Sequence, residues 1–160
     1  MNRTRNSIPQ PSREKVAQIL NARLADATDL RSQAKQAHWN LRSPQFIALH
    51  ELFDETAAVI VPHIDAVAER ATALGGVAEG DLRTVVKRSR LPAFPTGISA
   101  GPDHVNALAT SVAAAGKHAR AAIAMAMDAG DNDTADLFTD ISRDLDQRLW
   151  FLEAHTQANA

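Results

Sequence analysis

The chain has 160 residues, a length that fits one domain, and its hydrophobic fraction of 45% is enough for a core and excludes wholesale disorder. Aromatic residues make up only 4% and alanine is abundant, which favours packed helices over a sheet. The formal net charge of -2 gives no overall attraction to nucleic acid, and the absence of cysteine excludes disulfides and thiolate metal sites.

The first eleven residues are polar and contain two prolines, so we expect residues 1–11 to form a flexible tail without an apolar leader. One bundle domain is predicted over residues 12–158. Ser12 is the expected N-cap of a first helix that runs to about Asn40. A second helix is expected from Ser43, again as N-cap, to the glycine pair 75–76, with a local bend at Pro62. The turn between these helices is short, which predicts an antiparallel hairpin.

Residues 75–101 form a long connection in which residues 81–88 fit a short helix. A third helix is expected from about Pro102 to Asp128, and a fourth from about Asp133 to His155, with Gly130 in the break between them. Two hairpins joined by one long crossover have the connectivity of the ferritin-like bundles. We therefore predict an all-α fold: a ferritin-like four-helix bundle with a short helix in the long crossover between helices two and three.

Potential metal ligands cluster around the second helix. At about 100° per residue, four imidazole or carboxylate side chains fall within roughly a 100° sector of that helix, and a further histidine ends the first helix. Mixed imidazole and carboxylate ligands suit iron. The five residues are His38 at the end of the first helix and, on the second, His50, Asp54, Asp65 and Glu69.

The spacing of these ligands limits how they can meet. His50 and Asp65 lie about 22 Å apart along one helix at about 1.5 Å per residue, so they cannot bind one ion within it. A second copy of the helix, antiparallel across a two-fold axis, would bring Asp65 and Glu69 to His50 and Asp54 and create two identical sites. A metal site that uses the whole set must therefore lie between subunits. From spacing alone, a merely solvated polar face remains an equal alternative.

The segment 38–76, which contains HELFDE and DAVAERATALGG, resembles the signature of the Dps family (DNA-binding protein from starved cells), and DTADLFTDISRDLDQRLWFLEAH resembles its fourth helix. The resemblance implies ferroxidase ligands at His38, His50 and Asp54 of one subunit, with Asp65 and Glu69 from its two-fold mate. It also implies a hollow dodecamer that oxidises Fe(II), preferably with hydrogen peroxide, and stores the ferric mineral. This function combines iron storage with protection against peroxide.

Further residues near the ligands receive roles as well. Trp39 is expected to pack at the site, and Arg70 to pair with a carboxylate at the interface. Glu51 and Glu55 are either nucleation sites for ferric mineral or ordinary exposed carboxylates. Four acidic residues surround the turn into the fourth helix: Asp131, Asp133, Asp136 and Asp140. Capping by Asp131 or Asp133 is one interpretation, and the resemblance implies three-fold pores for Fe(II) entry as the other, with Asp136 favoured.

Competing functions have less support. A single-bundle di-iron protein needs Glu-x-x-His on two helices, and that pattern occurs nowhere in the chain. A DNA-condensing protein needs a basic surface, yet only Arg3, Arg5 and Arg13 precede Glu14, and no Lys or Arg follows Arg148. We therefore expect DNA binding to be weak and salt-sensitive or absent. We also expect no membrane partner, because no apolar stretch could cross a bilayer, and a cytoplasmic location, with nucleoid association left open.

Overall fold

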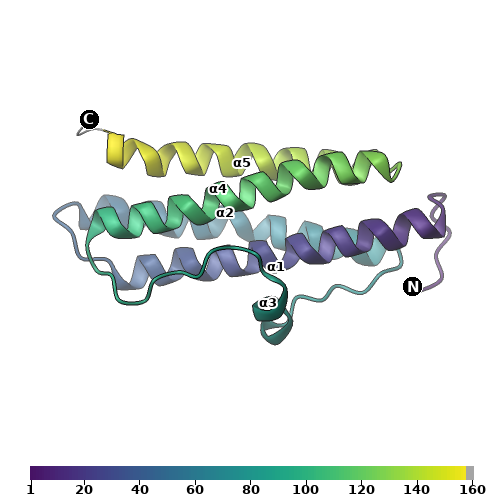
Figure 1. Ribbon diagram of the computed structural model, residues 1–160, viewed down its shortest axis with the longest axis horizontal. Coiled ribbons are helices and arrows are strands. Elements are labelled where there is room, and N and C mark those ends of the chain that lie inside the picture. Colours follow the sequence, from purple (N-terminus) through teal and green to yellow (C-terminus); the bar gives the residue numbers. More distant parts are fainter. Residues whose placement is uncertain (158–160) are drawn as a thin grey trace.

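Four long helices and one short helix make up most of the chain (Figure 1). The computed structural model describes residues 1–157, so the predicted domain end at residue 158 lies outside them. The helices are α1 (Gln10–Asn40), α2 (Phe46–Ala73), α3 (Leu82–Arg88), α4 (Gly101–Asp128) and α5 (Asn132–Gln157). None of these helices is long and apolar enough to cross a membrane.

The helices form two antiparallel hairpins. The α1–α2 pair lies beside the α4–α5 pair, and the crossover that carries α3 runs back along α1 (Figure 1). At the end of the crossover, the amide of Arg42 donates to the carbonyl of Ser99, so the α1–α2 turn lies beside the start of α4. The predicted all-α fold, with two hairpins and a short helix in the crossover, is confirmed.

Two predicted N-caps are wrong. α1 begins at Gln10, two residues before Ser12, because Pro11 is tolerated in the first turn of a helix. α2 begins at Phe46, and Ser43 forms the preceding turn instead: its carbonyl accepts the amide of Phe46 at 3.0 Å. The helix then continues through Pro62 without a break. Gln10 and Pro11, predicted to belong to the tail, are part of α1. The flexibility of residues 1–9 stays a prediction, although the amide of Asn2 donates to the carbonyl of Gly75 at 2.6 Å.

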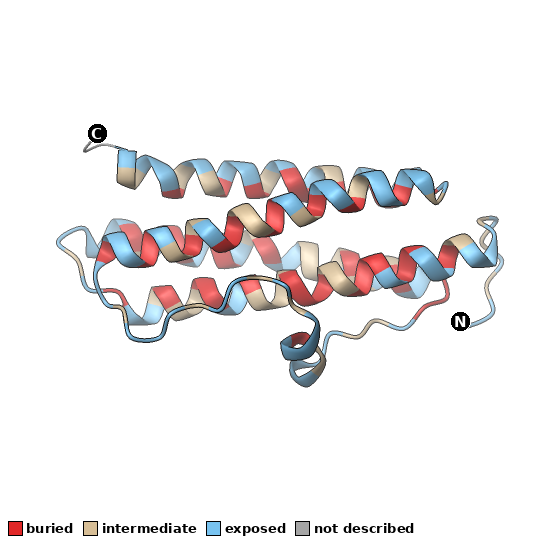
Figure 2. Cartoon of the chain, viewed as in Figure 1, coloured by how far each residue is buried: buried red, intermediate tan, exposed pale blue. Residues whose placement is uncertain are grey.

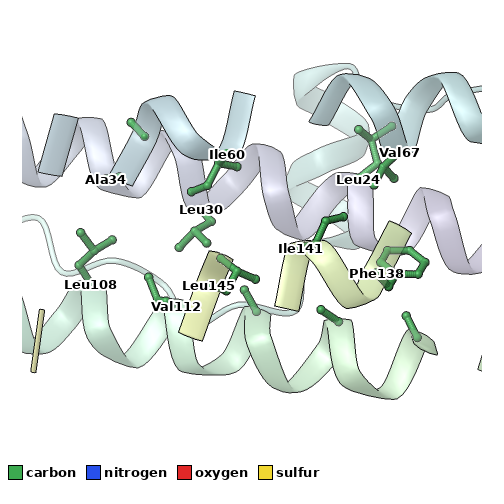
Figure 3. Close-up of a cluster of buried hydrophobic side chains, with 14 of the residues drawn as sticks. Leu24, Leu30, Ala34, Ile60, Val67, Leu108, Val112, Phe138, Ile141 and Leu145 are labelled. Carbon is green, nitrogen blue, oxygen red and sulfur yellow. The ribbon is translucent and has the colours of Figure 1, made fainter. Parts of the chain in front are cut away.

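The core is built from the apolar stripes of all four long helices. Buried residues recur along each long helix (Figure 2). At the centre, side chains from both hairpins interdigitate (Figure 3): Leu24, Leu30, Ala34, Ile60, Val67, Leu108, Val112, Phe138, Ile141 and Leu145. Burial of this apolar surface supplies the main free energy that holds the two hairpins together.

Polar side chains of α1 hold the crossover in place. Each of four donates to or accepts from a group of the crossover, which satisfies polar atoms that the bundle buries. These residues are Asn21, bonded to Val77 and Glu79; Asp26, bonded to the amide of Arg90; Asp29, bonded to Ser89; and Gln33, bonded to the carbonyl of Pro92. Helical periodicity alone did not reveal this anchoring.

Gly75 ends α2 in a conformation that other residues rarely adopt. Its φ is +86°, and an added Cβ would lie 2.6 Å from the carbonyl oxygen of Asn2. We expect Gly75→Ala to lower the free energy of unfolding by about 1–2 kcal/mol from the left-handed backbone alone. Gly97→Ala is the matched control, because a Cβ there meets nothing within 4 Å. Denaturant titrations of both variants test this, and equal stabilities would contradict it.

His104 at the start of α4 is buried among aromatic rings. It is 1% exposed, and its ring lies 5.9 Å from that of Phe94 and 6.4 Å from that of Phe53. Burial lowers the pKa of His104 below its usual value. The unfolded chain therefore binds more protons than the folded chain as the pH falls through about 6.5, and stability decreases there.

We accordingly expect His104→Leu to make the free energy of unfolding less sensitive to pH between about 7.5 and 5.5. The test is a set of urea titrations across this range. His155→Leu, a partly exposed histidine near the end of α5, is the control. An unchanged slope in the His104 variant would show that His104 carries no part of the acid sensitivity.

Candidate metal centre

Two histidines meet at the turn end of the α1–α2 hairpin. His38 lies in the last turn of α1 and His50 in the second turn of α2, and their rings stack with centroids 3.6 Å apart at 22°. Nδ1 of His38 lies 2.9 Å from the carbonyl oxygen of His50, and Nδ1 of His50 lies 3.1 Å from the carbonyl oxygen of His38. The hairpin therefore holds the two rings by a reciprocal pair of hydrogen bonds.

These bonds decide which ring nitrogens are free. A carbonyl oxygen only accepts, so each Nδ1 must carry the proton and donate it. In the neutral ring, Nε2 then keeps its lone pair, as in metal-binding histidines whose other nitrogen donates to a carbonyl or carboxylate. His38 and His50 thus present two oriented nitrogen donors, and this arrangement fits a divalent transition metal.

Asp54 lies one turn beyond His50 on α2 and is exposed. Lys35 of α1 donates to its Oδ1 at 2.5 Å. This hydrogen bond is the main cause that holds the pKa of Asp54 below its ordinary value, and the nearby positive charge of Lys35 lowers it further. Asp54 is therefore an ionised carboxylate beside the two imidazoles, with a lysine as its present partner.

Asp65 and Glu69 lie on the last turns of α2 and are exposed. Within residues 1–157 of one subunit, no group of three or more His, Asp or Glu side chains is arranged to hold a metal ion. The structure thus brings His38 and His50 together beside Asp54, and it does not bring Asp65 and Glu69 to them. This separation agrees with the helix spacing, which excluded a complete site on one chain.

The residues predicted beside the ligands are accessible in the single subunit. Trp39 is 68% exposed, and the ammonium of Lys35 lies 5.9 Å from its ring centroid. A packing role for Trp39 therefore requires a second subunit. Glu51 and Glu55 are exposed as well, and Glu55 lies 3.4 Å from the guanidinium of Arg148, a contact that the sequence did not reveal.

The acidic turn before α5 divides into one buried carboxylate and three exposed ones. Asp131 is 1% exposed and accepts from the amide of Thr134 at 3.0 Å, so the capping interpretation is confirmed for it. It also pairs with Arg70 inside the same subunit at 2.7 Å. Because its carboxylate is buried and fully engaged, we no longer assign it to a pore. Asp133, Asp136 and Asp140 are exposed, and Asp140 pairs with Arg143.

Comparison with known proteins identifies the family. A family model described as a ferritin-like domain matches residues 17–159. The DNA protection during starvation protein of Agrobacterium fabrum is 46% identical over 155 residues, which cover 97% of this chain and 96% of that protein. The structure of DpsC from Streptomyces coelicolor matches with a TM-score of 0.92 at 31% identity, over 97% of this chain and 91% of that one.

A third protein shares the fold. The Dps protein from Vibrio cholerae, described as a member of a broad superfamily of ferritin-like diiron-carboxylate proteins, matches with a TM-score of 0.89 at 23% identity, over 98% of each chain. The resemblance seen in segments 38–76 and 133–155 therefore extends over almost the whole chain. The chain belongs to the Dps family of ferritin-like proteins.

Proposed function

We propose that this protein is a ferroxidase and iron store. It binds Fe(II) at sites shared between two antiparallel subunits, oxidises it preferably with hydrogen peroxide, and keeps the ferric product inside a hollow dodecamer. Membership of the Dps family supports iron storage and protection as the general role. The observation that supports the site is the reciprocal bonding of His38 and His50, which leaves both Nε2 atoms free beside Asp54.

The proposed ligands are His38, His50 and Asp54 of one subunit, with Asp65 and Glu69 of the partner subunit. The imidazoles supply neutral nitrogen donors, and the three carboxylates offset the charge of the bound cations. A two-fold axis repeats the arrangement, so each dimer has two sites. Trp39 would be covered by the partner and would exclude water from the site.

The reaction consumes two Fe(II) ions for each hydrogen peroxide molecule. Each iron gives one electron, the O–O bond breaks, and two protons complete two molecules of water. Supplying both electrons at one site avoids the one-electron step that releases hydroxyl radical. Exposed Asp133, Asp136 and Asp140 would line the entry pore for Fe(II), and Glu51 and Glu55 would nucleate mineral. We propose a cytoplasmic location, and DNA binding that is weak or absent.

The test is Fe(II) oxidation by stoichiometric hydrogen peroxide, followed by the absorbance of the ferric product. We expect fast oxidation by the wild-type protein and large losses in His50→Ala and Glu69→Ala. His155→Ala, which changes a histidine outside the site, should match the wild type. A wild-type rate no higher than that of protein-free buffer would refute the proposed activity.

Lys35 competes with the metal for Asp54. Its ammonium bonds the carboxylate directly and repels a divalent cation at the same place. We expect Lys35→Met to tighten Co(II) binding about fivefold, since a unit charge is removed at close range in a water-exposed site. Lys117→Met, a change of an exposed lysine on α4, is the control. Weaker binding in Lys35→Met would show that Lys35 organises Asp54 for the metal rather than competing with it.

A further inference from the structure

A buried ionic network joins the end of α2 to the start of α5. Arg70 donates from Nη2 to Oδ1 of Asp131 at 2.7 Å and from Nε to Oγ1 of Thr134 at 3.0 Å. Thr134 in turn donates its amide and hydroxyl to Asp131, at 3.0 and 2.6 Å. The carboxylate of Asp131, almost inaccessible to water, thus receives three donors, and all of them come from two residues.

This network connects the two hairpins at a place where α2 carries proposed ligands. Arg70 directly follows Glu69, and its partners are Asp131, in the turn before α5, and Thr134, in the first turn of α5. The same end of α2 is held from α1, because Arg13 donates to the carbonyl oxygen of Leu74 at 2.8 Å. The last turn of α2 is therefore fixed relative to both neighbouring helices.

The position of Glu69 depends on this fixation. Its side chain and that of Asp65 are exposed in the subunit, so the helix backbone decides where the two carboxylates lie. A planar guanidinium with two directed hydrogen bonds holds the backbone in position and rotation more closely than a single contact does. Removing one partner of a buried ion pair leaves the other charge unpaired. Loss of either Arg70 or Asp131 should therefore destabilise the contact between the end of α2 and the start of α5.

We propose that Arg70, through Asp131 and Thr134, is a positioning residue for Glu69 and Asp65. It orients the carboxylate half of the site toward the partner subunit's histidine half. This inference rests on the proposed function, since it requires Glu69 to be a metal ligand. Arg70 thus acts within its own subunit, whereas the sequence had suggested pairing with a carboxylate at the interface.

The experiment compares Arg70→Met, Arg70→Lys and Asp131→Asn in the assembled protein. We expect Co(II) affinity to fall about 10–100-fold in Arg70→Met and Asp131→Asn, the usual effect of losing a residue that orients a metal ligand. The visible spectrum of bound Co(II) should change at saturation, and the KM for Fe(II) should rise. Arg70→Lys keeps the positive charge but loses the planar guanidinium with its two directed hydrogen bonds. Its Co(II) affinity should therefore lie between those of Arg70→Met and the wild type.

The matched control is Arg120→Met. Arg120 pairs with Asp146 at 2.8 Å, but both side chains are more than half exposed, and neither belongs to α2. Its Co(II) spectrum and affinity should equal those of the wild type. Asp131→Asn keeps an oxygen that can cap α5, so it decides the outcome if Arg70→Met fails to assemble.

The variant Glu69→Ala distinguishes a failure of the proposed function from a failure of the proposed positioning role. If Glu69→Ala leaves Co(II) binding unchanged, the proposed function itself is wrong. If Glu69→Ala weakens binding but Arg70→Met and Asp131→Asn keep the wild-type affinity and Co(II) spectrum, the ligands are correct and the positioning role is overturned. Loss of stability with an unchanged Co(II) spectrum would likewise overturn it, because that result describes a purely structural pair.

Discussion

A mixture of the inactive variants His50→Ala and Glu69→Ala, refolded together in equal amounts, should regain about a quarter of the wild-type rate of Fe(II) oxidation. Random pairing makes about half of the dimers mixed. In each mixed dimer one site combines the native histidine half of the Glu69→Ala chain with the native carboxylate half of the His50→Ala chain. The other site carries both defects. Activity is measured as absorbance of the ferric product, beside wild-type protein refolded alone.

The control is a mixture of His38→Ala with His50→Ala. Both substitutions damage the histidine half, so every site in that mixture lacks an imidazole, and we expect no recovery. Recovery in both mixtures would indicate that refolding alone restores activity. No recovery in either, with full activity of refolded wild type, would contradict a site shared between subunits.

Phe138→Ala should lower the free energy of unfolding by about 3–5 kcal/mol, the usual cost of removing a large buried ring. Phe138 is 0% exposed, and it lines a partly open cavity of about 30 Å³ together with Ile60, Val67 and Ile141. Removing the ring enlarges a space that the rigid helices cannot close, so the loss should lie toward the upper end of the range.

Chemical denaturation at one fixed protein concentration tests this, because the stability of the proposed oligomer would depend on concentration. Phe138→Leu leaves a smaller void and should lose less than Phe138→Ala. Trp150→Ala on the same helix, where the ring is exposed in the subunit, should have a small effect. Equal losses in all three variants would show that α5 is not anchored by this ring.

Much of the fold was predictable from local rules. The apolar periodicity of α1, α2, α4 and α5, the short turn near Ser43 and the breaks at Gly75 and Gly130 led to two hairpins and a long crossover, and the structure agrees. Asp81, at the start of the expected short helix 81–88, caps α3. Periodicity works here because each long helix has to bury one apolar face.

The helix starts were less predictable. Ser12 and Ser43 are good N-caps by residue type, yet α1 starts before Ser12 and α2 starts after Ser43. Pro11 fits the first turn of a helix, so α1 extends past the serine. Ser43 uses its oxygens within the turn, where its hydroxyl accepts the amide of Gln45. The preference of serine for the N-cap position is not realised where the turn offers its side-chain and backbone oxygens other hydrogen-bond donors.

The candidate ligands could be selected from the sequence, but their hydrogen-bond and ion-pair partners could not. Residue type and spacing identified His38, His50, Asp54, Asp65 and Glu69, and excluded a complete site on one helix. Only the fold shows that His38 and His50 bond each other's carbonyls, and that Lys35 holds Asp54. These partners come from a neighbouring helix, and helical spacing says nothing about contacts between helices.

The acidic turn before α5 likewise contains features that the sequence predicted and features that only the tertiary structure shows. By sequence, Asp131 could cap the fourth helix or line a pore, whereas Asp136 was favoured for the pore. Tertiary structure separates them, because Arg70 arrives from α2 and buries Asp131, while Asp136 stays exposed. The sequence by itself determined the helices, their connectivity and the potential ligands, since these depend on residue type and local spacing. Tertiary structure decided which charges are paired and buried, because burial depends on residues distant in the chain.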